Sequence, residues 1–158
     1  MSRKTAFHVA LIAAVAILFT AGTSLEAQTA ASVTSVGKGF SSEPSAPQFI
    51  TSQPLIGASV SMLGSHCPAD HVAYVFVGLS AKQPAQLPKG GFLYLNPDLM
   101  LFSGPLAISG AGTFLSAVAL PADPGLEGVK IALQVLTLST VDPTDYAVSN
   151  GVEWICGY

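Results

Sequence analysis

The sequence contains few charged residues. Lysine and arginine total 6 and aspartate and glutamate total 9 in 158 residues, so charged side chains make up 9% of the chain. That fraction is low for a soluble domain. A protein that binds nucleic acid or an anionic membrane surface is expected to have a basic patch. The lysines of this chain are scattered and form no such patch. Nucleic acid is therefore not a predicted partner.

The sequence also has only one long apolar run, and it lies at the N-terminus. Arg3 and Lys4 precede an apolar stretch from about residue 6 to 21, and small and polar residues follow it. This order is typical of a secretory signal peptide, and we predict cleavage after Ala27. The mature protein would then be secreted, extracellular or periplasmic, with no stable membrane span. The alternative is an uncleaved anchor, although the run is shorter than the roughly 18–20 residues that span a bilayer.

Cysteine is scarce. The chain has two cysteines, Cys67 and Cys156. Two cysteines in an exported chain predict one disulfide bond. The loop it would close holds about 90 residues, for which loss of chain entropy gives a stabilisation of about 4–5 kcal/mol. The predicted bridge would join the last strand to the start of the domain.

A sustained helical period is absent after the signal peptide. From residue 54 onward, short apolar runs recur between Gly, Pro, Asn and Asp residues. Seven to nine short strands in this spacing predict an all-β fold, an antiparallel β-sandwich of the Ig-like or jelly-roll-like kind over residues 54–158. The expected strands are 55–63, 71–79, 91–96, 99–103, 106–109, 112–120, 129–139, 146–150 and 151–158, with a short helical turn near 80–88 or 122–127.

Some of these runs are apolar on both faces. In the 71–79 stretch, Val72, Tyr74 and Phe76 alternate with Val75 and Val77. Such a strand is either covered on both sides or used for association with a second copy.

The segment between the predicted signal peptide and this domain has a different amino-acid composition. Residues 28–53 are rich in Ser, Thr, Ala and Gln and show neither a helical nor a strand period. This composition predicts a disordered linker. A spacer that holds the domain away from a surface is the functional alternative.

Several single residues carry local predictions. Gly90, Gly91 and Gly128 are placed to adopt the positive φ angles of tight connections. The Asn150-Gly151 pair lies between two apolar runs and predicts a hairpin turn. Gln134 lies in the apolar stretch "IALQVL" and is expected to face inward and bond to the backbone, because an unpaired buried amide costs roughly 1–3 kcal/mol.

Four stretches carry a resemblance: "PLIGASVSM", "GGFLYLNP", "LPADPGLEGVKIALQVL" and "AVSNGVEW". With them, residues 54–158 resemble a group of uncharacterised all-β modules at the C-termini of secreted bacterial proteins. The resemblance implies a β-sandwich in an extracellular setting and brings no catalytic residues with it. The chain departs from the group in standing alone and in having two cysteines.

The densest group of reactive side chains is "SHCPADH", residues 65–71. His66, Asp70 and His71, with Cys67, are residue types that bind zinc or copper. Their spacing matches no established metal motif, and the disulfide would remove Cys67. The interpretation we favour is a turn that Pro68 stiffens, with both histidines exposed.

The sequence offers little else for catalysis. It has no G-x-S-x-G elbow, and only His66 and His71 remain after the signal. Two acidic pairs, Asp142 with Asp145 and Asp123 with Glu127, are candidates for calcium binding or for catalytic carboxylates. Neither pair has the dense oxygen pattern of a dedicated calcium loop, and Asp-Pro pairs commonly open turns. We therefore predict no enzymatic activity, no cofactor and no metal.

The aromatic residues leave a second functional class open. Tyr94 and Trp154 are candidates for stacking on sugar rings, although packing in the core is the expected role of each. The leading hypothesis is a secreted, non-enzymatic module for extracellular binding, adhesion or envelope association. Its partner would be an unknown protein, a surface polymer or a second copy. The alternative is a carbohydrate-binding or hydrolytic secreted protein.

Overall fold

The protein is described by a computed structural model that covers residues 28–142 and 144–158. Within these ranges the chain forms nine strands and one 3-10 helix, η1 (Pro124–Leu126). The all-β prediction is confirmed, and η1 lies in one of the two stretches where a helical turn was expected. The predicted signal peptide, residues 1–27, lies outside the described part. No helix of the described part is long and apolar enough to cross a membrane.

The strands are β1 (Ser32–Val36), β2 (Gln48–Thr51), β3 (Ser59–Ser65), β4 (His71–Gln86), β5 (Phe92–Phe102), β6 (Leu106–Ala107), β7 (Phe114–Ala119), β8 (Lys130–Ser139) and β9 (Tyr146–Ile155).

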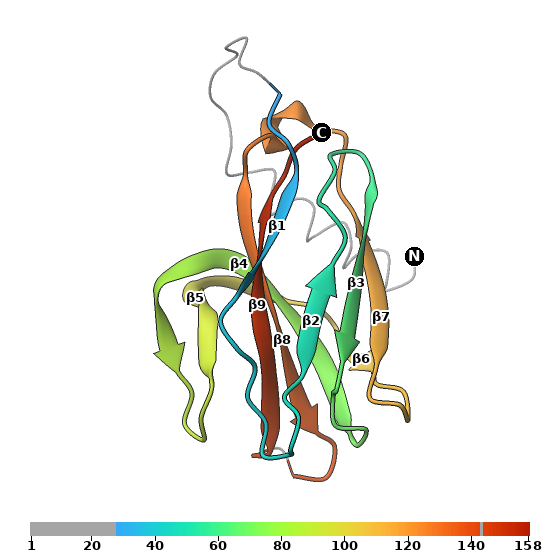
Figure 1. The fold of residues 1–158 in the computed structure, drawn as a ribbon, viewed down its shortest axis with the longest axis vertical. Coiled ribbons are helices and arrows are strands. Elements are labelled where there is room, and N and C mark those ends of the chain that lie inside the picture. The colour runs from blue at the N-terminus through green and yellow to red at the C-terminus, as the bar shows by residue number, and fades with distance from the viewer. Residues whose placement is uncertain (1–27, 143) are drawn as a thin grey trace.

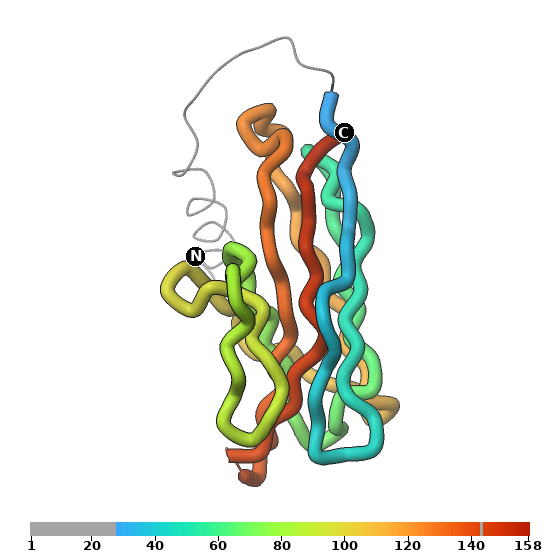
Figure 2. The backbone as a smooth tube through the Cα atoms, turned by 60° about the vertical axis from the view of Figure 1, so that its left-hand side comes forward, coloured from blue at the N-terminus to red at the C-terminus, as the bar shows by residue number. Residues whose placement is uncertain are grey.

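The strands form two antiparallel sheets. The larger sheet has the order β1-β9-β8-β4-β5, with β6 paired to β4, and the smaller sheet has the order β2-β3-β7. Figure 1 shows the two sheets as separate layers, with the smaller one on the right. In Figure 2 the same strands run nearly parallel to the long axis of the molecule. The sandwich is therefore asymmetric, and its smaller layer has β2 and β7 as its two edges.

Alternating burial in the strands builds the core between the layers. Along β3 the pattern is strictly exposed-buried, with Val60 and Met62 facing inward. The larger sheet contributes Val75, Leu133 and Trp154, each at most 2% exposed. This is the period of two that a half-buried strand requires. Most of the apolar side chains that the sequence places at alternate positions therefore meet in one layer.

Residues 28–53 do not form the predicted disordered linker. Ser32–Val36 pairs with β9 from Ser32↔Ile155 to Val36↔Gly151, and Gln48–Thr51 pairs with β3. Phe49, at the centre of β2, is fully buried. The prediction is wrong because the weak apolar pattern of these short strands is completed by neighbours elsewhere in the chain: β1 pairs with β9, and β2 pairs with β3 and contacts Asn150. The domain therefore begins before residue 54.

The β4 and β5 strands are longer than predicted and bend together into a hairpin that folds over the larger sheet. The pairing of β4 with β5 shifts register between Gly78 and Ser80 and again before Ala85. Beyond these irregularities the hairpin lies on the outer face of β8 and β9 (Figure 2). The hairpin turn at Gly90 and Gly91 has φ angles of 124° and 80°, as the sequence predicted. Gly128 is also confirmed at a positive φ, 74°.

Gln134 fixes this hairpin to the sheet. Its side chain is buried, and its Nε2 donates to the carbonyl oxygens of Phe92 and Ser149 at 2.8 and 2.9 Å. Its Oε1 accepts from the Tyr94 N–H at 2.9 Å. The side-chain amide thus bonds to the backbone of β5 in the way that a neighbouring strand would, and so links β8 to β5. The expectation of a buried Gln134 bonded to backbone groups is confirmed.

The predicted hairpin at Asn150-Gly151 is wrong. Both residues lie inside β9, which continues to Ile155, and the pairing with β8 has only a local irregularity there. Asn150 instead reaches to the smaller sheet, where its Oδ1 accepts from the Phe49 N–H at 2.9 Å and its Nδ2 donates to the Phe49 carbonyl at 3.0 Å. An Asn-Gly pair favours a turn, but here β9 is paired with β1 on one side and with β8 on the other, and this pairing keeps the backbone extended.

Candidate functional site

The two cysteines do not form the predicted disulfide. Cys67 and Cys156 are both free and buried. Cys156 pairs with Val129 at one end of β8, whereas the segment just after Cys67 bonds through Asp70 to Thr140 at the other end. The ten residues of β8 span roughly 33 Å, so the cysteines lie more than about 20 Å apart, far beyond the roughly 7 Å limit between bridged Cα atoms. Figure 1 shows the C-terminus at the end of the sandwich opposite to the end of β3.

Burial governs the chemistry of both thiols. It raises the pKa of Cys67 from 9.0 to about 11 and also raises the pKa of Cys156. Only the thiolate is an effective nucleophile, so each thiol is less reactive than an exposed one at the same pH. At pH 8 the shift at Cys67 lowers its thiolate fraction from about one tenth to about one thousandth.

We expect neither thiol to react with Ellman's reagent within minutes in the native protein at pH 8. Both thiols should react when the same sample is unfolded in guanidinium without reductant. As a control, the reaction rate of free cysteine under the same conditions gives the rate expected for a fully exposed thiol. Two unreactive cysteines in the unfolded, unreduced chain would contradict the structure, because they would show a disulfide.

The "SHCPADH" segment separates its two histidines. His66 is exposed with a φ of 55°, and it lines an open hollow of about 500 Å³ together with Lys38 and Asn150. His71 is only 6% exposed. The prediction of two exposed histidines is therefore correct for His66 and wrong for His71. His71 begins β4 on the same face as Ala73, which points to the core, and this alternation is the signal that could have revealed its burial.

Buried His71 is held by polar neighbours. Its Nδ1 lies 3.0 Å from the Thr137 hydroxyl, and its Nε2 lies 3.7 Å from both Asp70 Oδ1 and Asp145 Oδ2. Both carboxylates are exposed enough to remain hydrated. A protonated imidazole would therefore form two ion pairs at this end of the sandwich. The cluster joins the loop before β4 to the loop before β9.

The geometry assembles no catalytic triad in this segment. The hydroxyl of Ser65 lies 3.3 Å from Nδ1 of His66, whereas Asp70 lies beside His71. A serine nucleophile and an aspartate therefore contact different histidines. No group of three or more His, Cys, Asp or Glu side chains in residues 28–142 and 144–158 is arranged to hold a metal ion.

The acidic pairs serve as turn and cap residues. Asp142 accepts two hydrogen bonds from Thr144, at 2.9 and 2.8 Å, and these bonds lower the pKa of its carboxyl. Asp123 caps η1 by accepting from the Gly125 N–H at 2.9 Å. Glu127 accepts from the Thr29 N–H and ties the start of the described chain to the loop before β8. Each of these contacts uses one oxygen of its carboxylate.

Neither aromatic candidate offers a platform for a sugar ring. Trp154 is 2% exposed, and its Nε1 donates to the Thr51 hydroxyl at 2.7 Å. Tyr94 lies over Gly37 and Gly151, and its hydroxyl accepts from the Lys38 N–H at 3.0 Å. Both side chains therefore hold strands together, which confirms the expected packing roles.

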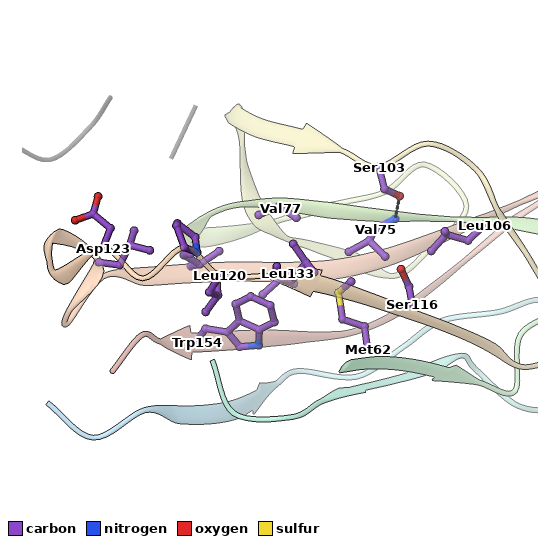
Figure 3. A pocket seen from close by; sticks show the side chains of 15 residues that line it. Met62, Val75, Val77, Ser103, Leu106, Ser116, Leu120, Asp123, Leu133 and Trp154 are labelled. Atoms are coloured by element: carbon purple, nitrogen blue, oxygen red, sulfur yellow. Dashed lines mark hydrogen bonds between the residues drawn. The ribbon is translucent and has the colours of Figure 1, made fainter. Parts of the chain in front are cut away.

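A small apolar cavity lies between the sheets. It encloses about 100 Å³, and Met62, Val75, Leu133 and Trp154 are among its lining residues (Figure 3). Asp123 is its only charged lining residue, and its carboxylate points away from the apolar side chains in Figure 3. Ligand pockets usually measure about 300–1,000 Å³. We therefore assign no ligand to this cavity.

A candidate binding surface is the outer face of the smaller sheet. Ile50 on β2 pairs with Leu63 on β3, which in turn pairs with Leu115 on β7. Their relative exposures are 60%, 37% and 75%. Cross-strand neighbours have Cβ atoms about 5 Å apart. The three side chains therefore form one continuous stripe across all three strands, which we call the aliphatic row.

This face carries no charge at any strand position. The other outward residues are small or neutral, so nothing repels a partner or requires the desolvation of an ion. The sequence does not reveal this surface, because the composition of residues 28–53 predicts a linker and the row exists only when the three strands are paired. The outward strand residues are Gln48, Ile50, Ser59, Ser61, Leu63, Ser65, Leu115, Ala117 and Ala119.

Comparison with known proteins gives no relative from which a function could be taken. No protein-family model, curated protein or solved structure matches the chain.

Proposed function

We propose that the chain is an exported, non-enzymatic β-sandwich module that associates with other extracellular or envelope components through the outer face of its smaller sheet. The observation that carries this proposal is the aliphatic row, Ile50, Leu63 and Leu115, on a face without charged residues. In this proposal the smaller sheet makes the contact with the partner, and the larger sheet with its β4-β5 hairpin supports the smaller sheet.

The physical basis is the burial of apolar area. Removal of apolar surface from water stabilises a complex by about 25 cal/mol per Å², and a buried leucine contributes about 1.5–3 kcal/mol. Exposed aliphatic side chains that stand singly are common, but three adjacent ones on a flat face are typical of an interaction surface. Covering the serine hydroxyls around the row costs much less than covering an ion would, and the alanine methyls carry no such cost.

Two features of the sequence support an extracellular setting for this activity. Residues 1–27 have the order of a secretory signal peptide, and residues 54–158 resemble modules of secreted bacterial proteins. The low content of charged residues suits a module that is attached to a larger structure. Catalysis is not part of the proposal, because the side chains of His71, Asp123, Glu127 and Asp142 bond to groups of their own chain.

The aliphatic row can be tested by hydrophobic interaction chromatography of the mature chain on octyl agarose. We expect Leu115→Lys to weaken retention by roughly tenfold in partition, because an exposed leucine contributes about 1.5–3 kcal/mol when covered. The substitution should not disturb folding, since lysine is common at the edges of sheets.

Val141→Lys is the matched control. Val141 is 83% exposed, more than Leu115, but it lies in the loop between β8 and β9 and outside the row. It should change retention much less than Leu115→Lys. Equal shifts for the two variants, or no retention of the unmodified chain, would contradict a contact role for this face.

A further inference from the structure

The β7 edge of the smaller sheet has unpaired backbone groups. Leu120 donates its N–H to the carbonyl of Ala58 at 2.9 Å, just after β7. Because backbone groups alternate in direction along an antiparallel strand, the N–H and C=O groups of Leu115, Ala117 and Ala119 point away from β3. No hydrogen bond to these groups is present among the described residues. In Figure 1, β7 is the outermost strand on this side.

The opposite edge of the same sheet is closed at Phe49. On β2 the outward N–H and C=O of Phe49 bond to the side-chain amide of Asn150 at 2.9 and 3.0 Å. Natural proteins usually protect a free edge with a lysine, a proline, a bulge or a covering loop. The sequence of β7, "FLSAVA", contains no charged residue and no proline. In the described part of the smaller sheet, β7 therefore has the longer unprotected edge.

We infer that two copies of the chain pair through their β7 strands, antiparallel and related by a two-fold axis at Ala117. This inference rests on the proposed function, because it names the partner that extends the same face. In this register Ala117 lies opposite Ala117 of the second copy, and Leu115 lies opposite Ala119. Each of these opposed pairs exchanges two backbone hydrogen bonds, so every outward group of the three residues is satisfied.

The register is also complementary in its side chains. On the outer face, leucine opposes alanine and alanine opposes alanine, so the contact has room for Leu115. The outer faces of the two copies would form one uncharged face on a six-strand sheet made of two β2-β3-β7 sets, and the two aliphatic rows would be offset by four residues along β7. On the inner face, Ser116 and Val118 are neutral residues that line the apolar cavity. No like charges oppose one another, so a second copy is favoured over a charged peptide.

Analytical ultracentrifugation of the mature chain over a range of concentrations tests the pairing. We expect a concentration-dependent monomer–dimer equilibrium. Ala117→Pro should weaken the dimer by about tenfold or more, because proline removes the outward N–H. The same substitution leaves the pairing with β3 intact, since proline is tolerated where the N–H of an edge strand faces solvent. Ala117→Ser keeps the N–H and should dimerise like the unmodified chain.

Cross-linking supplies a test that does not depend on proline. In Ala117→Cys the two thiols would face one another across the axis, where the Cα atoms of a bonded pair lie about 5.5 Å apart, a spacing that suits a disulfide. Mild oxidation should give a covalent dimer. Ala85→Cys, exposed on β4, is the matched control and should stay monomeric under the same oxidation.

The outcomes separate this inference from the proposed function. A chain that stays monomeric at all concentrations, with Ala117→Cys no easier to cross-link than Ala85→Cys, would overturn the pairing. A dimer that Ala117→Pro does not weaken would also overturn it, because another surface would then hold the copies together. In both cases a weaker retention of Leu115→Lys than of Val141→Lys would still support the contact face, whereas equal retention would remove the proposed function as well.

Discussion

Replacement of Gln134 by alanine should lower the free energy of unfolding by about 3–5 kcal/mol. The amide makes three hydrogen bonds to backbone groups, two from Nε2 and one to Oε1, in a site that is 1% exposed. Alanine would leave the carbonyls of Phe92 and Ser149 and the N–H of Tyr94 without these partners. Each buried polar group that loses its partner costs about 1–3 kcal/mol, and water can reach only part of this site.

The loss can be measured by guanidinium unfolding followed by the fluorescence of Trp154, which is the single tryptophan of the chain. A fall in melting temperature of about 10 °C or more should accompany it. Hydrogen exchange should also accelerate at the Tyr94 amide, because Gln134 holds the hairpin on the sheet. Gln86→Ala is the matched control, since Gln86 is exposed at the end of β4 and should change stability by less than about 0.5 kcal/mol. Similar losses for both variants would contradict the role of Gln134.

Replacement of Trp154 by alanine should cost about 3–5 kcal/mol, the usual range for a large buried aromatic residue. The indole is 2% exposed, packs beside Leu133 and Met62 at the cavity, and donates to Thr51 at 2.7 Å. Alanine would add the volume of the indole to an existing cavity of about 100 Å³, so the core would lose contacts that neighbouring side chains cannot restore. Unfolding should be followed by far-UV circular dichroism because the variant has no tryptophan.

Two further variants separate packing from hydrogen bonding at this position. Trp154→Phe keeps most of the apolar contact and should lose clearly less stability than Trp154→Ala. Thr51→Val removes the acceptor of the indole N–H and should cost about 1–2 kcal/mol. A Trp154→Ala variant as stable as the unmodified chain would contradict the buried position of the indole between the sheets.

The fate of the cysteines shows why sequence reasoning failed at that point. The sequence predicts a bond between Cys67 and Cys156 because each cysteine is the other's only possible partner in a chain with a predicted signal peptide. The bridge depends on a distance, however, and β8 separates their ends of the sandwich by its full length. The count of cysteines contains no information on that distance.

The candidate surface shows the same limit. Ile50, Leu63 and Leu115 occur in three separate stretches of the sequence, and each alone is an ordinary exposed aliphatic residue. Asn150 likewise has the sequence signature of a turn, and its closure of the β2 edge requires Phe49 to lie beside β9. Pairing between distant strands decides both features.

By itself the sequence determined the all-β class, most strand positions, the positive φ angles at Gly90, Gly91 and Gly128, and the buried, bonded state of Gln134. These features depend on local periodicity, on the conformational freedom of glycine and on the cost of an unpaired buried amide. The tertiary structure alone decided that residues 28–53 contribute strands, that His71 is buried, and that the cysteines are apart. It also decided that Asn150 bonds to the Phe49 backbone at the β2 edge while the β7 edge stays open. Those properties follow from which strands are neighbours, and long-range pairing is set by the packing of the whole sandwich.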